Sequence, residues 1–191
     1  MPVRKIAVVG HSHVGHLPLD STVYPVDRRI RSTFRYARFS VPGTTACRLF
    51  LDRTLENPLR TYDPDVIVVY VGSNDIDVPM SHQWFFHRLM HSMIMLGNRL
   101  QGYTTNRKAE IIYMTIEQRR DPKNVTADCY KTRRNRMNSL LRNNKRMNLC
   151  MNFMTEDYFQ EDGIHFQEEA YRVMAEKIKT KVENYAVRRR W

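Results

Sequence analysis

The chain has 191 residues, of which 42% are hydrophobic, and it carries a formal net charge of +11 at pH 7. This hydrophobic content supports a packed core and excludes an intrinsically disordered chain. No apolar segment reaches the roughly 18 residues of a transmembrane helix, and the first ten residues resemble a strand more than a signal peptide. We therefore expect one domain over residues 1–191 in an intracellular, cytoplasmic protein.

Short strand-like runs alternate with helical patterns along the chain. Runs rich in Val, Ile or aromatic residues predict strands over residues 5–10, 35–41, 66–71, 110–116 and 149–154. Apolar residues at helical spacing predict helices over residues 44–56, 81–101, 126–143 and 166–185. Thr44 or Thr45 is the expected N-cap of the first helix, and Thr126 that of the third. This alternation is typical of an α/β fold, here a three-layer α/β/α sandwich around a five-stranded parallel sheet of flavodoxin-like strand order.

Four short polar motifs directly follow strand-like runs or precede the last helix. They are Gly10-His11-Ser12, Pro42-Gly43-Thr44, Gly72-Ser73-Asn74-Asp75 and Asp162-Gly163-Ile164-His165. In a parallel α/β sheet, ligands bind beyond the carboxyl ends of the strands. The fold therefore predicts that all four motifs meet at one edge of the sheet.

The first and last motifs together offer the parts of a nucleophilic catalyst. Ser12 is the expected nucleophile, His165 the base that takes its proton, and Asp162 the carboxylate that orients the imidazole. The simpler alternatives are an ordinary turn serine and a turn followed by a helix-capping histidine.

The two middle motifs offer donors for a developing oxyanion. We expect the backbone N–H groups of Ser12 and Gly43 and the side-chain amide of Asn74 to form the oxyanion hole. Gly43 as a plain turn residue and Asn74 as a residue capping its own loop are the alternatives. Asp75 is expected to brace this loop.

These motifs, in this order, resemble the SGNH hydrolases, also called the GDSL esterase/lipase superfamily. The Ser, Gly, Asn and His of the family name correspond to Ser12, Gly43, Asn74 and His165. A basic domain of this size is also similar to the esterase domains of animal LINE-type retrotransposons. The resemblance implies a serine esterase that hydrolyses small, acetyl-type esters through an acyl-enzyme, without a cofactor. One departure is His11, which stands where the family usually has Asp.

The positive charge suggests a different function. No acidic residue occurs between Tyr130 and Thr155, a stretch that contains the candidate polyanion-binding residues Arg133, Arg134, Arg136, Arg142, Lys145 and Arg146. The basic tail Arg188-Arg189-Arg190 adds to them. A catalytically weak or silent module that binds nucleic acid is therefore the alternative function, and a solvated helix face is the simplest explanation. A flavodoxin-like nucleotide binder is disfavoured because no phosphate-binding loop is visible.

The histidines and cysteines do not predict a metal site. His11, His13 and His16 crowd the nucleophile turn, but no carboxylate or Cys lies at ligand spacing among them, so we expect no metal. The three cysteines, Cys47, Cys129 and Cys150, are odd in number and scattered, which favours buried, reduced thiols.

Overall fold

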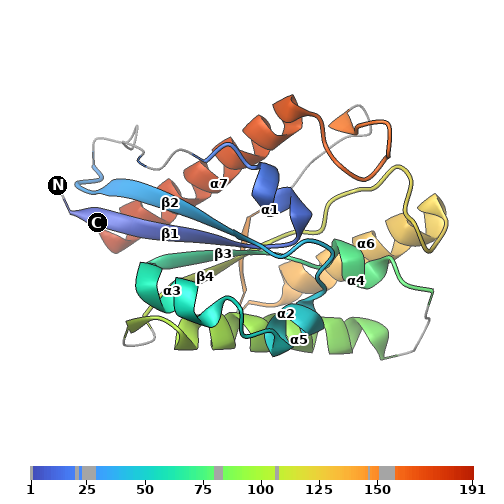
Figure 1. Ribbon diagram of the computed structural model, residues 1–191, viewed down its shortest axis with the longest axis horizontal. Helices are drawn as coiled ribbons and strands as arrows, with labels where there is room; N and C mark the ends of the chain where they lie inside the picture. The colour runs from blue at the N-terminus through green and yellow to red at the C-terminus, as the bar shows by residue number, and fades with distance from the viewer. Residues whose placement is uncertain are drawn as a thin grey trace.

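The computed structural model describes residues 2–19, 22, 29–79, 84–105, 108–145, 147–150 and 158–191. A central sheet lies between two layers of helices (Figure 1). Its strands are β1 (Val3–Gly10), β2 (Thr33–Ser40), β3 (Val66–Tyr70), β4 (Glu110–Met114) and β5 (Asn148–Cys150). All neighbouring pairs are parallel, and the order is β2-β1-β3-β4-β5. The predicted α/β sandwich, with five parallel strands in flavodoxin-like order, is confirmed.

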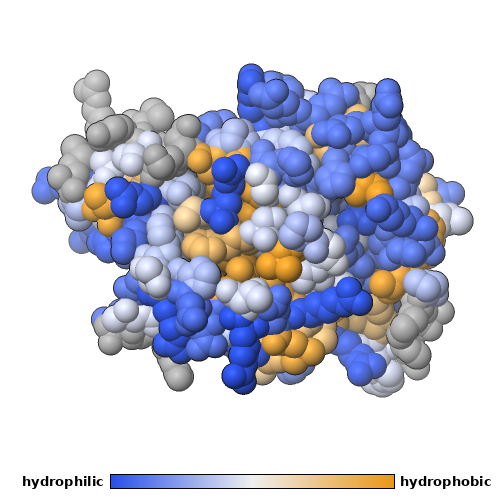
Figure 2. All heavy atoms as spheres, viewed as in Figure 1, coloured by the Kyte–Doolittle hydropathy of each residue, from blue (hydrophilic) through white to orange (hydrophobic). Residues whose placement is uncertain are grey.

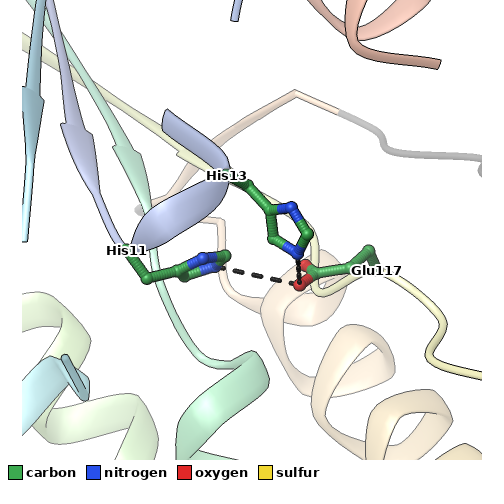
Figure 3. A group of neighbouring side chains, drawn as sticks. All are labelled: His11, His13 and Glu117. Carbon is green, nitrogen blue, oxygen red and sulfur yellow. Dashed lines mark ion pairs between the residues drawn. The ribbon is translucent and has the colours of Figure 1, made fainter. Parts of the chain in front are cut away.

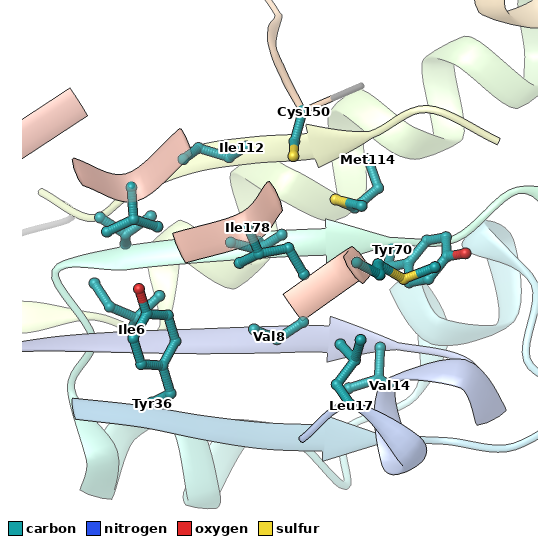
Figure 4. Close-up of a cluster of buried hydrophobic side chains, with 14 of the residues drawn as sticks. Ile6, Val8, Val14, Leu17, Tyr36, Tyr70, Ile112, Met114, Cys150 and Ile178 are labelled. Carbon is teal, nitrogen blue, oxygen red and sulfur yellow. The ribbon is translucent and has the colours of Figure 1, made fainter. Parts of the chain in front are cut away.

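The helices divide between the two faces of the sheet. They are α1 (Ser12–His16), α2 (Ala46–Leu51), α3 (Glu56–Tyr62), α4 (Ser73–Ile76), α5 (Phe85–Gly102), α6 (Ala127–Asn143) and α7 (Glu168–Arg189). Side chains of α1 and α7 share one hydrophobic cluster with Ile6 and Val8 of β1 (Figure 4). Side chains of α2, α3, α5 and α6 share the other with Ala7 and Val9. Alternate residues of β1 therefore anchor the two layers, as the pleat of a strand requires.

The predicted helix over residues 44–56 is wrong in its extent. The structure ends α2 at Leu51 and begins a separate helix, α3, at Glu56. The Asp52 carboxylate accepts a hydrogen bond from the Thr54 N–H at 2.8 Å, a local turn that competes with helix continuation. Pro58 fits the first turn of α3 because N–H groups there have no helical partner.

Other boundaries differ by a few residues. β4 ends at Met114, two residues earlier than predicted, because both backbone groups of Ile116 bond to the Asn138 side chain of α6 at 2.8 Å. α7 continues to Arg189, beyond the predicted end at residue 185. Thr45 and Thr126 accept N-capping hydrogen bonds, as predicted. Of the predicted strand over residues 149–154, residues 151–154 lie outside the described residues.

Most of the apolar surface is enclosed. Figure 2 shows a face covered largely by hydrophilic side chains, with hydrophobic residues visible between them as separate patches. Among the described helices, none combines the length and the apolar character that crossing a bilayer requires. All three cysteines are free thiols, but only Cys150 is buried; Cys47 is exposed, which corrects that part of the expectation.

Candidate active site

The turn between β1 and α1 holds Ser12 at the carboxyl edge of the sheet. A Cβ atom at Gly10 would collide with the carbonyl oxygen of Tyr70 on the neighbouring strand β3. The Gly10 carbonyl accepts the Val41 N–H at 2.8 Å, and the His11 N–H donates to Tyr70 at 3.3 Å. A glycine is thus required where β1 passes closest to β3, and α1 begins two residues later with Ser12 half-buried.

His165 connects Ser12 to Asp162. Its Nε2 lies 3.3 Å from the Ser12 Oγ, and its Nδ1 lies 2.6 Å from the Asp162 Oδ2. The other carboxylate oxygen of Asp162 accepts the N–H groups of Ile164 and His165 at 2.9 and 2.8 Å. Gly163, at a φ of 63°, allows the chain to fold back so tightly. The structure thus brings the three predicted catalytic residues together.

The electrostatics of the site keep Asp162 ionised. Partial burial opposes ionisation of the Asp162 carboxyl, but the hydrogen bonds from the His165 ring and from the two backbone N–H groups outweigh it and lower its pKa to about 2. Because the Asp162 carboxylate is charged and can only accept a hydrogen bond, a neutral His165 ring carries its proton on Nδ1, the nitrogen that faces Asp162. The Nε2 lone pair then faces the Ser12 hydroxyl.

A cleft of about 500 Å³ opens beside this triad. Its lining includes Ser12, Gly43, Asn74 and His165, so the predicted oxyanion donors share one surface with the predicted nucleophile. Gly43 has a φ of 68°, a conformation that L side chains rarely adopt, although a Cβ there would meet open space. The glycine is therefore required by the backbone conformation.

The amide of Asn74 has a defined orientation. Its Nδ2 donates to the Thr44 carbonyl at 2.9 Å, and its Oδ1 accepts from the Arg119 guanidinium at 2.7 Å. Since an amide nitrogen carries two hydrogens, one N–H remains for the cleft. Both ends of the amide are fixed before any substrate arrives, which is the preorganisation that an oxyanion donor needs.

Arg119 is a site residue that the sequence analysis missed. Its side chain is 4% exposed and donates to Asp77 at 2.8 Å and to Ser73 at 3.2 Å, in addition to Asn74. Arg119 also lines the cleft. Its position shortly after the fourth predicted strand places it at the same edge of the sheet as the four motifs, and this was the available signal.

Asp75 braces its loop, as expected. Both of its carboxylate oxygens lie 3.0 Å from the Ala46 N–H at the start of α2. Burial raises the pKa of Asp75 to about 6, against the effect of hydrogen bonds from the backbone. The Asp75 carboxylate therefore supports the start of α2, and it does not belong to the described residues that line the cleft.

His11 also lies away from the cleft. It is buried, and its Nε2 lies 3.1 Å from the Oγ of Ser73, the first residue of α4, which links the turn that carries Ser12 to that helix. Burial lowers the pKa of His11 to about 4; the charges of Arg119 and His165 act in the same direction, and that of Glu117 opposes them. A neutral His11 thus connects the turn that carries Ser12 to α4 without lining the cleft.

The candidate polyanion-binding residues differ in exposure and in their partners. Arg133 donates to the carbonyls of Ile76 and Val78 and so braces α4 from inside. Arg134 is half-buried and bonds to Asn135. Arg136, Arg142 and Lys145 are exposed, and Arg146 lies outside the described residues. None of those described lines the cleft.

Comparison with known proteins identifies the fold. No protein-family model matches the sequence, and no curated protein matches it. Among solved structures, the psychrotrophic esterase EstA from Pseudoalteromonas sp. is similar with a TM-score of 0.62 and 14% identity over 95% of this chain and 98% of that one. A GDSL-like lipase from Bacteroides thetaiotaomicron has a TM-score of 0.64 and 13% identity, covering 95% and 89%.

An acetyl xylan esterase, AlAXEase, has a TM-score of 0.58 and 18% identity, covering 93% of this chain and 99% of that one. At such identities the likeness concerns the backbone arrangement alone. The chain therefore shares the α/β fold of esterases and lipases that include GDSL-type enzymes.

Proposed function

We propose that this protein is a serine hydrolase that cleaves small carboxylic esters through an acyl-enzyme on Ser12. The observation that carries the proposal is the continuous contact from Ser12 through His165 to Asp162, at 3.3 and 2.6 Å, beside an open cleft. A serine hydroxyl is a weak nucleophile by itself and needs an adjacent base that a third group orients.

In the first half-reaction, the Ser12 Oγ attacks the ester carbonyl while His165 Nε2 takes the hydroxyl proton. The charge that develops on the carbonyl oxygen would be met by the N–H groups of Ser12 and Gly43 and by the free N–H of Asn74. His165 then returns the proton to the leaving alcohol, and the Ser12 acyl-enzyme remains. In the second half-reaction, water attacks the acyl group by the same route, which releases the acid and restores Ser12.

The lining of the cleft is mixed. It combines the polar side chains of Arg48, Lys123 and Asn124 with the apolar side chains of Pro42, Val78 and Ile164. One structural neighbour is an acetyl xylan esterase, which supports acetyl-type esters as the first class to test.

The test is hydrolysis of p-nitrophenyl acetate, butyrate and octanoate by the wild type, Ser12→Ala and the matched control Ser139→Ala, which alters an exposed serine of α6. We expect turnover to be highest on acetate, lost in Ser12→Ala and unchanged in Ser139→Ala. A structure of the Pseudoalteromonas neighbour was determined in a form inhibited by monoethylphosphonate. A serine-directed phosphonate should therefore add one adduct to the wild type, located on Ser12 by peptide mass spectrometry. Equal turnover of the wild type and Ser12→Ala would reject the proposal.

The alternative is a silent module that binds nucleic acid. Its support is the exposure of Arg136 and Arg142 on α6 and of Lys145 just after that helix, none of which lines the cleft. A wild type without phosphonate adduct or turnover, but with salt-dependent oligonucleotide binding, would favour this alternative.

A further inference from the structure

A second cluster of polar side chains lies beneath the nucleophile turn. His11 and His13 flank Ser12, and both rings point toward one carboxylate oxygen of Glu117, which follows β4 (Figure 3). His11 Nε2 lies 3.8 Å and His13 Nε2 3.6 Å from the Glu117 Oε1. The three side chains are at most 1% exposed. Together they form a buried two-histidine, one-carboxylate group.

Hydrogen bonding does not explain these contacts. A charged histidine on a carboxylate normally lies at about 2.7–2.9 Å, well below the observed separations. Within the described chain, His13 Nε2 has no hydrogen-bond partner, whereas His11 Nε2 also lies 3.1 Å from the Ser73 Oγ. Burial, the Glu117 charge and a hydrogen bond to Glu117 raise the pKa of the Tyr70 hydroxyl, which is therefore the neutral group that contacts this carboxylate. A neutral hydroxyl does not balance the charge of a buried carboxylate, which remains costly unless a proton or cation accompanies it.

The separations suit three ligands around one ion. With Zn–N and Zn–O bonds of about 2.0–2.2 Å, ligand atoms at the corners of a tetrahedron lie roughly 3.3–3.6 Å apart. The observed 3.6 and 3.8 Å are within a few tenths of an ångström of that range, and all three ligand atoms lie within 4.8 Å of one another.

The surroundings orient one ligand and balance a nearby charge. His13 Nδ1 pairs with the Tyr171 hydroxyl at 2.8 Å, which directs Nε2 toward Glu117 as outer partners of metal-bound histidines do. The positive charge of the nearby Arg119 guanidinium would repel a bound metal ion, but the Asp77 carboxylate, 2.8 Å away, neutralises that charge.

We propose that His11, His13 and Glu117 bind a divalent transition-metal ion, with Zn²⁺ the best match to two imidazoles and a carboxylate. Ca²⁺ and Mg²⁺ fit poorly because they select all-oxygen sites. None of the three ligands lines the cleft, so the ion acts by joining the turn that carries Ser12 to the segment after β4. This role is independent of the proposed esterase reaction.

The first experiment uses the untagged full chain. Protein stripped with a chelator is titrated with ZnCl₂, and with CoCl₂ as a spectroscopic probe, while bound metal and melting temperature are measured. We expect equimolar uptake, a higher melting temperature and the intense visible absorption of low-coordinate Co²⁺. Stripped protein that takes up neither ion, with no change in melting temperature, overturns the proposal.

The second experiment assigns the ligands. Glu117→Gln keeps the side-chain shape and should weaken Zn²⁺ affinity at least about a hundredfold, since loss of an outer partner alone costs 10–100-fold. His87→Gln, at an exposed histidine of α5, is the matched control and should bind as the wild type does. Wild-type affinity in folded Glu117→Gln would overturn the assignment; if that variant does not fold, the wild-type titration decides.

The third measurement separates this site from the esterase. Ser12→Ala should lose turnover yet bind Zn²⁺ like the wild type. Failure of the esterase proposal would therefore leave metal uptake intact, and an active wild type without metal uptake would overturn the metal site alone.

Discussion

The nucleophile turn separates two groups of polar side chains that differ in both exposure and hydrogen bonding. On the open side, His165 is one-third exposed and contacts its partners at 2.6 and 3.3 Å. On the buried side, His11 and His13 are almost fully enclosed and lie 3.6–3.8 Å from Glu117. Three consecutive residues thus serve two environments, with Ser12 facing the cleft and its neighbours facing the interior. Solvent access suits the first group to chemistry, and enclosure suits the second to holding the turn in place.

The largest expected effect is the loss of turnover when Ser12, on the open side of the turn, is replaced. Ser12→Ala should lower turnover by about a thousandfold or more because the acyl-enzyme cannot form. The free energy of unfolding should change by less than about 0.5 kcal/mol, since the hydroxyl is only half-buried. Steady-state kinetics and denaturant unfolding measure the two effects. If Ser12→Ala also lowered the free energy of unfolding by several kcal/mol, the loss of activity could not be assigned to the open side alone.

His165→Ala should cost about as much turnover as Ser12→Ala, and the double variant should cost no more than either, because the pair acts as a unit. Asp162→Asn should cost less than His165→Ala, since a poorly oriented imidazole retains some activity. Additive losses in the double variant would contradict a shared step.

Asn74→Ala should lower kcat by roughly a hundredfold with little change in KM, because its amide is assigned to the oxyanion and not to the ground state. Arg119→Lys serves as the comparison, since it keeps a buried cation but loses the guanidinium geometry that orients Asn74. We expect a smaller loss of kcat there. An effect of Asn74→Ala confined to KM would make it a residue that positions substrate.

The pH dependence of stability separates Asp162 from other carboxylates. Its pKa falls from 3.8 in the unfolded chain to about 2 in the fold, so its ionised form stabilises the native state. That contribution is complete above about pH 4 and is lost as the pH falls toward 2. Unfolding measured from pH 5 to pH 2 should show a smaller acid loss in Asp162→Asn than in the wild type. Identical profiles would mean that the hydrogen bonds to Asp162 contribute nothing net.

The smallest effect concerns the cations on α6 and just after it, some of which are exposed and others internal. Reversing exposed Arg136, Arg142 and Lys145 to Glu should leave stability nearly unchanged. The logarithm of the binding constant for a single-stranded oligonucleotide falls linearly with the logarithm of the salt concentration, with a slope of about 0.7 per phosphate contact. Loss of three contacts should therefore reduce that slope by about 2. Gel-shift titration at two salt concentrations provides the measurement, and Ser12→Ala is the unaffected control.

Arg133→Glu tests the internal case. Its guanidinium binds two carbonyls of the segment at α4, so its loss should cost about 1–3 kcal/mol of unfolding free energy. If oligonucleotide binding does not respond to the triple reversal even at about 50 mM salt, these surface charges are only a solvated face.

Local pattern was sufficient for the sheet and for the motif positions. The Val and Ile runs that became β1 and β3 are readable because a buried parallel strand is apolar on both faces. The four motifs follow from the rule that the carboxyl ends of parallel strands share one edge. The missed break between α2 and α3 depended on one side-chain hydrogen bond at Asp52, which competes with a helical pattern that otherwise continues.

Contacts between distant segments were decided only in three dimensions. His11 and His13 offered no carboxylate at ligand spacing, because their partner, Glu117, comes from the far side of β3 after β4. Arg119 reaches Asn74 and Asp77 for the same reason. Periodicity and short motifs report on neighbours along the chain, whereas the burial of a charge and the partner that compensates it depend on which strands lie side by side. The proposed nucleophile and its proposed base could therefore be predicted from sequence motifs, whereas the buried residues beneath them could not.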